Sequence, residues 1–409
     1  PYRDREKEES LKIFKEMYNG DHKQGEHVLR AKINMSSPNM LMRDPVIYRA
    51  MEVKHHRTGD SWKIYPMYDW THGESDYIEQ VSHSLCTLEF EPHRELYDWF
   101  LDSISPLKGI RPKQREFSRL NLSYTITSKR NLAKLVEEGV VGGWDDPRMP
   151  TISGLRNRGY TPESLKSFAL TVGISKRENV IDVSLLEFCV RTHLNEEAPR
   201  AMAVLDPLKI SIINYNENKE ESVNFDINPQ KPGQGKRAVL FSKNIYIERE
   251  DFQENPEEGF FRLSLGEEVR LKNAYIIKAK NIIKNEKGQI TEIECEYDEK
   301  SKSGSNTEES NRKVKATIHW VSAETAVEAT INIYDRLFKV PEPGKSQDLL
   351  SEVNENSLEI KSAKVEPYLA SAKDGDHFQF QRSGYFVRTS NKKTLEFNKT
   401  VGLRDGWKK

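Results

Sequence analysis

The sequence predicts a multidomain protein in which an α/β part is joined to an all-β part. The chain has 409 residues, 36% of them hydrophobic, so it can bury more than one core, and roughly two to four domains are expected. Between residues 68 and 118, apolar runs alternate with helical patterns, as in the second half of a doubly wound α/β fold. From Ala198 onward, many short strands with frequent turns predict barrels or sandwiches.

The composition argues against a membrane protein and against a zinc protein. No apolar run approaches the ~20 residues of a membrane span, and the N-terminus does not resemble a signal peptide. Cys86, Cys189 and Cys295 lie far apart in apolar surroundings, which indicates buried, reduced thiols, and the ten histidines form no ligand cluster. A cytoplasmic protein without a metal site of its own is therefore expected.

The net charge gives no sign of a nucleic-acid-binding protein. There are 63 Lys and Arg residues against 64 Asp and Glu residues, so the formal net charge is -1. Proteins that bind nucleic acids usually have an excess of basic residues. A neutral total can still hide a basic face opposite an acidic one.

Residues 1–67 are predicted to form a separate α+β piece. Leu11, Phe14 and Met17 recur every three residues and Gly20 closes the pattern, which predicts a helix, and an extended region follows. Composition alone does not decide whether this piece is an ordinary α+β lobe or a specialised binding domain.

Residues 68–118 carry the next part of the α/β fold. A helix is predicted over residues 94–104, with Leu96 and Phe100 on its apolar face. The apolar run 64–67 reads as a strand, so the polar side chains directly after it, from Tyr68 onward, are expected to project from a strand end, where such folds bind ligands. The plain alternative for Tyr68 is a half-buried aromatic residue.

A strand followed by a helix is predicted in residues 119–148. Leu120, Leu122 and Tyr124 alternate with polar residues as in a short strand. Leu132 and the apolar residues after it then recur at helical spacing, so that Ser128 is placed as the N-cap.

This junction suits a phosphate group. The first turn of a helix has unpaired N–H groups and the positive end of the dipole, and Lys129 and Arg130 add cations there. A lysine on a loop can neutralise charge that grows on phosphate oxygens during phosphoryl or nucleotidyl transfer. The plain alternative is a solvated basic helix start, because Ser-Lys-Arg occurs again at 175–177.

A helical region extends from Lys129 to about Leu194, and Thr161 with Pro162 opens one of its helices. In the β-rich half, the alternation from Val314 to Trp320 predicts a strand with one polar face that includes His319. Residues 286–289 read as a hairpin turn, and the polar stretch 301–311 reads as a mobile loop.

Four blocks of this sequence resemble class I aminoacyl-tRNA synthetases, most closely the bacterial glutaminyl-tRNA synthetase family. They are IYPMYDWTHG, HSLCTLEF, EFSRLNLSYTITSKR and GWDDPRMPTISGLRNRGY, which begin at residues 64, 83, 116 and 143. The resemblance continues to about Trp407 through NEEAPRAMAVLDP, GEEVRLKNAY, IHWVSA, YDRLF and TVGLRDGW. The His-Ile-Gly-His-type motif of the class is absent and the chain begins with Pro1, so we expect the C-terminal part of a longer enzyme.

The resemblance implies a domain plan. It comprises an acceptor-end-binding α+β insertion (1–67), the second half of a Rossmann-like catalytic domain (68–118), a catalytic-loop and helical subdomain (119–197), a proximal anticodon-binding β-barrel (198–240 with 346–409) and a distal one (241–345).

The resemblance also implies roles for individual residues. Glutamine is expected to bind to Tyr68, His72, Phe90 and Gln114. ATP is expected on Thr87, Arg119, Leu120, Thr127, Ser128 and Lys129, with Lys129 and Ser128 as catalytic residues. The inner bend of tRNA is expected on Lys176 and Arg177, for which a solvated charged turn is the alternative. The anticodon is expected on Arg200, Arg262, Arg270, Gln379 and Arg382, although any single arginine could instead be a solvated charge or part of an ion pair.

Some positions depart from the family pattern. Thr127 stands where methionine is usual in the catalytic loop, and Pro92 stands where some relatives carry an acidic residue that reads the acceptor stem. The spacing between Phe90 and Gln114 is slightly longer than in relatives. Arg115, which stands beside Gln114, could pair with a carboxylate, so a pocket for glutamate stays an alternative.

The function that the resemblance implies is ATP-dependent attachment of glutamine to tRNA(Gln) through glutaminyl-adenylate, with Mg²⁺ accompanying ATP. A cytoplasmic monomer without membrane contacts is expected. Two alternatives stay open: a glutamyl-tRNA synthetase on the same β-barrel scaffold, and a tRNA-binding fragment without catalysis of its own.

Overall fold

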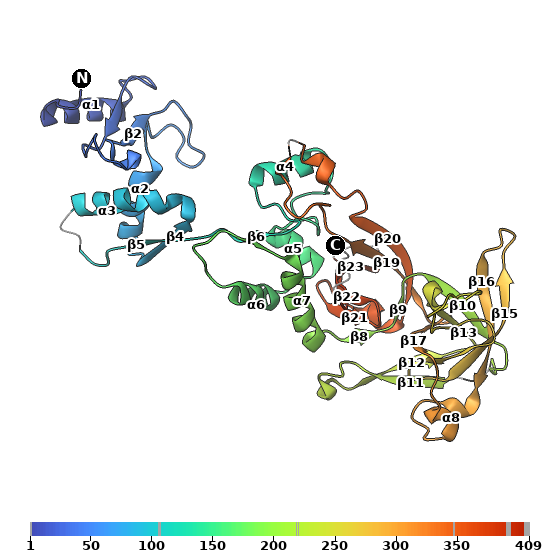
Figure 1. The fold of residues 1–409 in the computed structure, drawn as a ribbon. Coiled ribbons are helices and arrows are strands. Elements are labelled where there is room, and N and C mark those ends of the chain that lie inside the picture. The colour runs from blue at the N-terminus through green and yellow to red at the C-terminus, as the bar shows by residue number, and fades with distance from the viewer. Residues whose placement is uncertain are drawn as a thin grey trace. The chain divides into compact units, whose positions relative to one another are not determined.

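The computed structural model describes residues 2–104, 108–217, 219, 221–346, 348–389 and 394–404. Positions 405–407, the end of the last sequence block, lie outside the described residues. The chain divides into two compact units (Figure 1): Pro1–Leu120 with Ile174–Asn179, and Asn121–Gly173 with Val180–Lys409. Mixed α/β structure and two β-rich sheets are both present, as the fold class predicted.

The first unit begins with the predicted helix and a small antiparallel sheet. Its elements are α1 (Lys7–Asn19), β1 (Val28–Arg30), η1 (Met40–Met42), β2 (Val46–Ala50) and β3 (Ile64–Pro66). Gly20 ends α1 in a left-handed conformation, as its position predicted. Helix α1 buries Met17 against the sheet, whereas Leu11 is half exposed, so only a narrow stripe of the helix is in the core.

The remainder of the first unit is a small α/β assembly. It contains α2 (Tyr68–Ile78), β4 (His83–Thr87), η2 (Leu88–His93), α3 (Arg94–Ser103) and β5 (Lys113–Phe117). Strands β4 and β5 are parallel, with Ser84 opposite Gln114, and α3 lies between them in sequence. Leu96 and Phe100 of α3 are buried, as predicted.

The expected strand end before Tyr68 is a different structure. Strand β3 pairs antiparallel with β2 and belongs to the N-terminal sheet, so it is not a strand of the parallel α/β sheet. Helix α2 begins at Tyr68, so Tyr68 and His72 project from the first turns of a helix. An apolar run can identify a strand, but which strand it pairs with depends on residues outside the run.

The second unit opens with helices. They are α4 (Lys129–Glu137), α5 (Ile152–Arg158), α6 (Pro162–Val172) and α7 (Val183–Glu197), with the short parallel pair β6 (Asn121–Leu122) and β7 (Val180–Ile181). Thr161 caps α6 by accepting a bond from the Ser164 N–H, as predicted. The strand predicted over residues 120–124 is only two residues long, because Tyr124 turns the chain with a φ of 56°.

Two seven-stranded sheets form the β-rich half. The first, in the order β8-β21-β22-β23-β19-β20-β9, contains β8 (Arg200–Ala201), β9 (Ala203–Val204), β19 (Val327–Tyr334), β20 (Leu358–Val365), β21 (His377–Phe380), β22 (Gly384–Arg388) and β23 (Glu396–Val401). Its two edge strands, β8 and β9, are separated by one residue, so the sheet curls until its edges nearly meet. Phe380, Phe386 and Phe397 fill its core.

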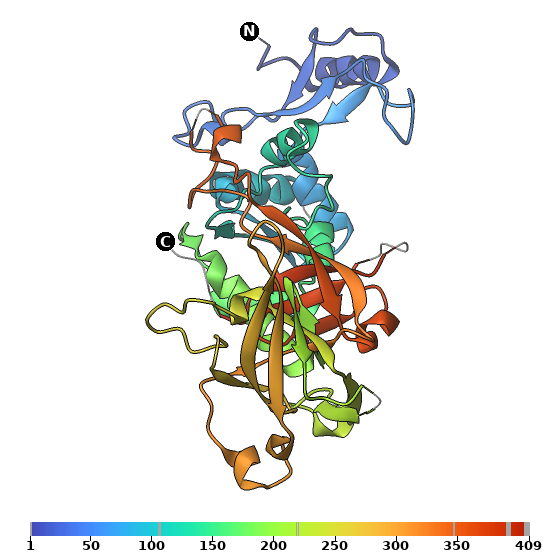
Figure 2. The ribbon, with the colours of Figure 1, turned by 90° about the vertical axis from the view of Figure 1, so that its right-hand side faces the viewer.

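The second sheet closes in the same way. In the order β17-β14-β15-β16-β10-β13-β18, it contains β10 (Pro207–Ile212), β13 (Asn244–Glu248), β14 (Glu268–Leu271), β15 (Ile276–Lys284), β16 (Ile290–Asp298), β17 (Thr317–Ile318) and β18 (Val321–Ser322). The pair β11 (Glu221–Asp226) and β12 (Lys236–Phe241) packs on its core, where Trp320 is fully buried. Strands β15 and β16 run side by side as a long hairpin in Figure 1 and again in Figure 2.

The chain passes from one sheet to the other at positions that differ from 240 and 345, the predicted borders between the proximal and distal barrels. Strand β12 packs with the second sheet, and β19 belongs to the first. The chain therefore crosses between sheets near residues 205–206 and 323–326, where nothing in the composition marks a change. As domain borders, both sets of positions remain predictions.

Local predictions in this half have mixed outcomes. The turn at residues 286–289 is confirmed, with Gly288 at a φ of 77°. His319, placed on a polar face by alternation, is 1% exposed. The stretch 301–311, expected to be a mobile loop, is part of a hydrogen-bonded structure with η5 (Glu299–Ser301) and α8 (Glu308–Asn311). Short polar side chains cap both of these elements, which composition alone does not reveal.

The other short helices are η3 (Pro232–Gln234), η4 (Arg249–Asp251), η6 (Leu350–Glu352) and η7 (Pro367–Ser371). Among the described residues, no helix is both long enough and apolar enough to cross a membrane.

The same residues contain no group of three or more His, Cys, Asp and Glu side chains that could hold a metal ion. Cys189 and Cys295 are buried and Cys86 is half-buried, all as free thiols.

Candidate functional site

Four residues predicted to bind glutamine come together in the first unit. The Tyr68 ring stacks on His72 at 5.1 Å between centroids and lies 5.4 Å from Phe90. Gln114 is 2% exposed and donates from Nε2 to the Phe90 carbonyl at 2.8 Å. Tyr68 remains 52% exposed, so the cluster presents an open aromatic face.

Polar contacts hold this cluster in place. The His72 Nε2 lies 2.7 Å from the Ser84 hydroxyl and 3.3 Å from Asp76, which also accepts a bond from the Tyr97 hydroxyl at 2.9 Å. Burial raises the pKa of Tyr68, so its phenol stays protonated and can donate a hydrogen bond at neutral pH. The Tyr68 phenol therefore offers a neutral donor to a ligand.

The cations near the cluster are either paired or turned away. Along β5 the side chains alternate, so Gln114 and Glu116 face the interior while Arg115 faces solvent. Arg94 donates to the Glu116 carboxylate from Nε at 2.9 Å and from a second nitrogen, and Gln114 donates to the same carboxylate at 2.9 Å. The charge of Arg94 is thus already compensated. The Gln114 Oε1 atom is buried without a hydrogen-bond partner among the described residues.

The Glu116 carboxylate predicts a pH dependence of stability. Donation from Arg94, followed by donation from Gln114, lowers the pKa of Glu116 from 4.5 to about 2. A depressed folded-state pKa stabilises the protein fully above pH 4.5, and this contribution is lost as the pH falls toward 2. We expect up to about 3 kcal/mol of unfolding free energy to be lost over this window, reduced by solvent screening of the partly exposed Arg94.

Urea unfolding of the wild type and of Glu116→Gln at several pH values measures this contribution. The difference in free energy of unfolding between the wild type and Glu116→Gln should shrink steadily below pH 4.5. The matched control is Glu89→Gln, because Glu89 pairs with Arg119 at 3.5 Å and both side chains are more than half exposed. A pH-independent gap for Glu116→Gln would contradict the assignment.

The residues predicted for ATP in the first unit follow the ends of two parallel strands. Strands β4 and β5 are in register with Thr87 opposite Phe117. Thr87 therefore ends one strand, and Arg119 and Leu120 follow the other after Ser118, at the edge where parallel sheets bind ligands. Arg119 and Leu120 are both exposed.

The predicted catalytic loop belongs to the second unit and is anchored before it becomes exposed. The Ser123 N–H donates to the Ile181 carbonyl at 2.9 Å, and the Tyr124 N–H donates to the Pro341 carbonyl at 2.7 Å. Ile126 is buried in a core with Leu132. A Cβ atom at Gly344, whose φ is 84°, would come within 2.9 Å of Ile126, so this packing needs a glycine there.

After Ile126 the loop turns into solvent and starts α4. Thr127, Ser128, Lys129 and Arg130 are all exposed. Ser128 occupies the N-cap position as predicted, but its hydroxyl makes no capping bond. The first helical bond is from the Leu132 N–H to the Ser128 carbonyl, so the N–H groups of the first turn remain unpaired within the helix. Lys129 stands at the first helical position beside them.

The residues predicted for the inner bend of tRNA lie on an exposed segment of the first unit. The Ser175 carbonyl accepts a bond from the Ser118 N–H at 2.7 Å, and the Ser175 hydroxyl accepts one from the Arg177 N–H at 2.9 Å. Lys176 and Arg177 are both exposed. The Lys176 ammonium is 3.9 Å from Glu116.

The residues predicted for the anticodon lie in three separate networks of the second unit. In the first, Arg200 is opposite Gln379 across the β8–β21 pair. Arg200 is buried and donates to the backbone carbonyls of Ala198 and Asn195, and Gln379 donates to the Tyr385 hydroxyl at 2.9 Å. The Asn195 side chain joins the two residues, because its oxygen accepts from both Arg200 and Tyr385.

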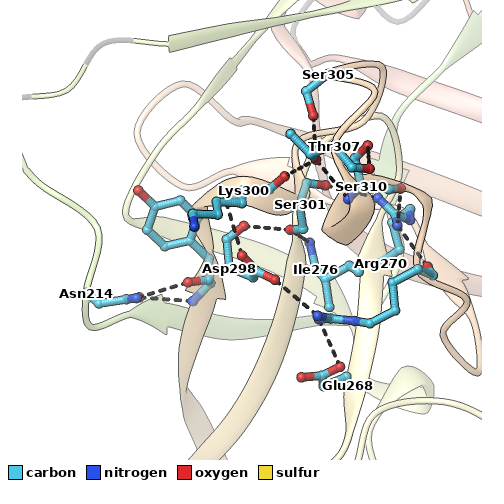
Figure 3. A network of polar contacts seen from close by, with 12 residues as sticks. Asn214, Glu268, Arg270, Ile276, Asp298, Lys300, Ser301, Ser305, Thr307 and Ser310 are labelled. Carbon is cyan, nitrogen blue, oxygen red and sulfur yellow. Dashed lines mark hydrogen bonds and ion pairs between the residues drawn. The ribbon is translucent and has the colours of Figure 1, made fainter.

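Arg270 lies in the second network, around η5 and α8 (Figure 3). Its guanidinium donates to the carbonyls of Ser301 and Ser310 at 3.1 and 2.8 Å. The Ser301 hydroxyl in turn accepts from the Ile276 N–H at 2.8 Å. Any contact of these donors with a base would have to replace carbonyl bonds that hold this segment.

The third network joins Arg262 and Arg382 through Asp251, a residue that the sequence did not single out. Asn195, Glu116 and Arg94 were missed in the same way. Each lies within an ordinary charged or polar stretch, and no spacing or motif sets it apart from solvated neighbours.

Comparison with known proteins covers the whole chain. Family models described as tRNA synthetases class I (E and Q) match it: the catalytic domain over residues 1–196 and the anti-codon binding domain over residues 198–298 and 317–389. The glutamine–tRNA ligase of Aliivibrio fischeri (strain MJ11) is 52% identical over 410 residues, which is all of this chain and 74% of that protein. Those of Idiomarina loihiensis and Cronobacter sakazakii are 53% and 51% identical over 412 residues, covering 73% and 74% of their lengths.

Proposed function

Because this chain belongs to the glutamine–tRNA ligase family of class I tRNA synthetases, we propose that it attaches glutamine to tRNA(Gln) at the expense of ATP. The glutamine carboxylate attacks the α-phosphorus of ATP, which forms glutaminyl-adenylate and releases pyrophosphate. The 2′-hydroxyl of the terminal adenosine of tRNA then takes the aminoacyl group and AMP leaves. The observation that supports this best is identity above 50% along the full chain to relatives named for this reaction.

Activation needs positive charge where negative charge grows. We assign this role to Lys129, whose ammonium is exposed at the start of α4 beside unpaired N–H groups. Ser128 and Thr127 would add a hydroxyl and backbone donors for phosphate oxygens. In the first unit, Thr87, Arg119 and Leu120 are assigned to ATP because they follow the ends of adjacent parallel strands.

Mg²⁺ enters the proposal only together with ATP. The described residues contain no cluster of acidic side chains suited to a divalent cation, so we assign its ligands to phosphate oxygens of the nucleotide. When bound, the ion would compensate phosphate charge. The roles given to the side chains of this protein do not depend on its coordination.

Recognition of glutamine is assigned to Tyr68, His72, Phe90 and Gln114. A neutral amide suits neutral donors and acceptors, and the nearby guanidinium of Arg94 is compensated by Glu116. Among the described residues, the guanidinium nearest the cluster is already paired, so a glutamate carboxylate would have no free cation there to replace its hydration, and we expect it to be rejected. Charging of tRNA(Gln) with labelled glutamine and with labelled glutamate tests this choice. Preferential transfer of glutamate would favour a glutamyl enzyme on the same scaffold.

The Tyr68 hydroxyl provides a direct test of the pocket. We expect Tyr68→Phe to raise the KM for glutamine at least about tenfold, because one hydrogen bond to the substrate amide is lost while the ring packing is kept. The matched control is Tyr77→Phe on the same helix, whose exposed hydroxyl donates to the Lys108 carbonyl. Equal glutamine KM values for both variants would remove Tyr68 from the pocket.

The remaining assignments concern tRNA. We propose that Lys176 and Arg177 contact the phosphate backbone of its inner bend, where exposed cations can replace counterions. Arg200, Arg262, Arg270, Gln379 and Arg382 are assigned to the anticodon, whose unstacked bases expose edges that guanidinium and amide groups can bond. We expect a monomer in the cytoplasm, and sedimentation of a stable dimer would contradict the first part of this expectation.

A further inference from the structure

Asp251 is a fully buried carboxylate that holds two arginines from separate parts of the second unit. Its side chain is 0% exposed. Arg382 donates to both of its oxygens, from Nη1 at 2.6 Å and from Nη2 at 2.7 Å, and the Nε of Arg262 lies 3.3 Å from Oδ1. Two guanidinium groups therefore share one acceptor, which keeps them close together despite their like charges.

The backbone around this group is arranged to bring the arginines together. Arg382 lies in the turn between β21 and β22 with a φ of 68°, a left-handed conformation that costs free energy for a residue other than glycine. The Leu263 N–H donates to the Asp251 carbonyl at 3.0 Å, which places Arg262 beside the same carboxylate. The bidentate bond to Asp251 offsets the unfavourable conformation of Arg382.

A buried histidine supports Arg382 from the other side. The Nε2 of His319 faces the Ala203 carbonyl at 2.9 Å and Glu248 at 3.4 Å, so it carries the ring hydrogen. The Nδ1 atom is then an acceptor, 3.3 Å from Nη1 of Arg382. One face of Arg382 is thus fully engaged inside the protein.

The outer parts of both arginines stay accessible. The side chains of Arg262 and Arg382 are 37% and 30% exposed, whereas Asp251 is closed off from solvent. A ligand with base edges could therefore contact the arginines without contacting Asp251. Arg262 also pairs with the exposed carboxylate of Glu250 at 3.3 Å, so two carboxylates balance the two guanidinium groups, and such a ligand would be recognised by the exposed N–H groups rather than by a net charge.

We propose that Asp251 is a positioning residue for anticodon reading: it sets the spacing and orientation of Arg262 and Arg382 so that both can bond anticodon bases. This inference rests on the proposed function, because the two arginines are assigned to the anticodon there. Asp251 itself touches no RNA. Its removal leaves two cations without a shared acceptor, so they repel each other and lose their common orientation.

The variant Asp251→Asn tests this role, since it keeps the volume and removes the charge. We expect the KM for tRNA(Gln) to rise on the order of tenfold with kcat and ATP–pyrophosphate exchange unchanged. We also expect discrimination against a tRNA with a substituted anticodon base to fall. A purely structural role would lower the melting temperature and affect both tRNAs in proportion. The matched control is Glu254→Gln, which removes a surface carboxylate paired with Lys284 in the same sheet region.

A second variant keeps the test decisive if Asp251→Asn folds poorly. Arg382→Lys retains the charge but cannot form the bidentate bond, so it should show the same KM increase and loss of discrimination. The double variant should then be no worse than either single one, as expected for residues that act as a pair. Additive effects, or unchanged discrimination in both single variants, would overturn the proposal. If the wild type does not charge tRNA(Gln) with glutamine, the proposed function fails instead.

Discussion

Replacing Lys129 by alanine is expected to reduce ATP–pyrophosphate exchange by about 10² to 10³-fold, which corresponds to about 3 to 4 kcal/mol of lost transition-state stabilisation. The ammonium of Lys129 is exposed at the first position of α4, where the helix leaves N–H groups free for an anion. Removing the side chain deletes the mobile cation but leaves the buried anchors of the loop, Ile126 and Leu132, untouched. The rate should therefore fall without a loss of fold.

Exchange is measured with saturating glutamine and tRNA(Gln), together with the tRNA dissociation constant. We expect that constant to stay within about twofold of the wild type, because Lys129 is assigned to the phosphates of ATP. The matched control is Lys134→Ala, which removes a lysine from the last turn of the same helix. Unchanged exchange in Lys129→Ala, or an equal loss in Lys134→Ala, would contradict the catalytic assignment.

Replacing Arg237 by methionine is expected to lower the free energy of unfolding of the second unit by about 3 to 5 kcal/mol. Arg237 and Glu366 form an ion pair at 2.8 Å in which the side chains are 7% and 1% exposed. Glu366 also accepts a bond from the Met202 N–H at 2.8 Å, in the one-residue connection between the edge strands β8 and β9. Without Arg237, this carboxylate is left buried and unpaired.

Chemical unfolding followed by fluorescence measures the loss. The double variant with Glu366→Gln should recover a large part of it, because the amide is neutral and its oxygen can still accept from Met202. The matched control is Arg249→Ala, which breaks an exposed pair with Asp206 and should cost no more than about 1 kcal/mol. A similar small loss for Arg237→Met would show that the buried pair adds little to stability.

Several elements could be predicted from local periodicity and capping residues. The helix closed by Gly20, the helix opened by Thr161 and the turn at Gly288 all occur where the sequence indicated them. These features depend on interactions within a few residues, so the local sequence is sufficient. The site residues came from resemblance to a family, which supplies identities but no geometry.

Three of the predictions that were wrong required knowledge of partners outside the local sequence. The run before Tyr68 is a strand, but it pairs with β2, and the polar stretch 301–311 is ordered by Arg270 from another strand. His319 alternates as if it were on an exposed face, yet contacts with Ala203 and Arg382 bury it. In each case a hydrogen bond to a remote residue outweighs the local preference.

The sequence by itself determined the mixture of α/β and β-rich parts, the helices that begin near Lys7, Arg94, Lys129 and Pro162, the turn at 286–289, and the residues on which function was predicted. Only the tertiary structure decided that Gln114 and Glu116 support the aromatic cluster of Tyr68, His72 and Phe90, and that Asp251 joins two arginines. Asp251 and Arg382 are 131 positions apart. Periodicity describes what a residue does within its own helix or strand, whereas the partners of a buried charge are set by how the chain folds back on itself.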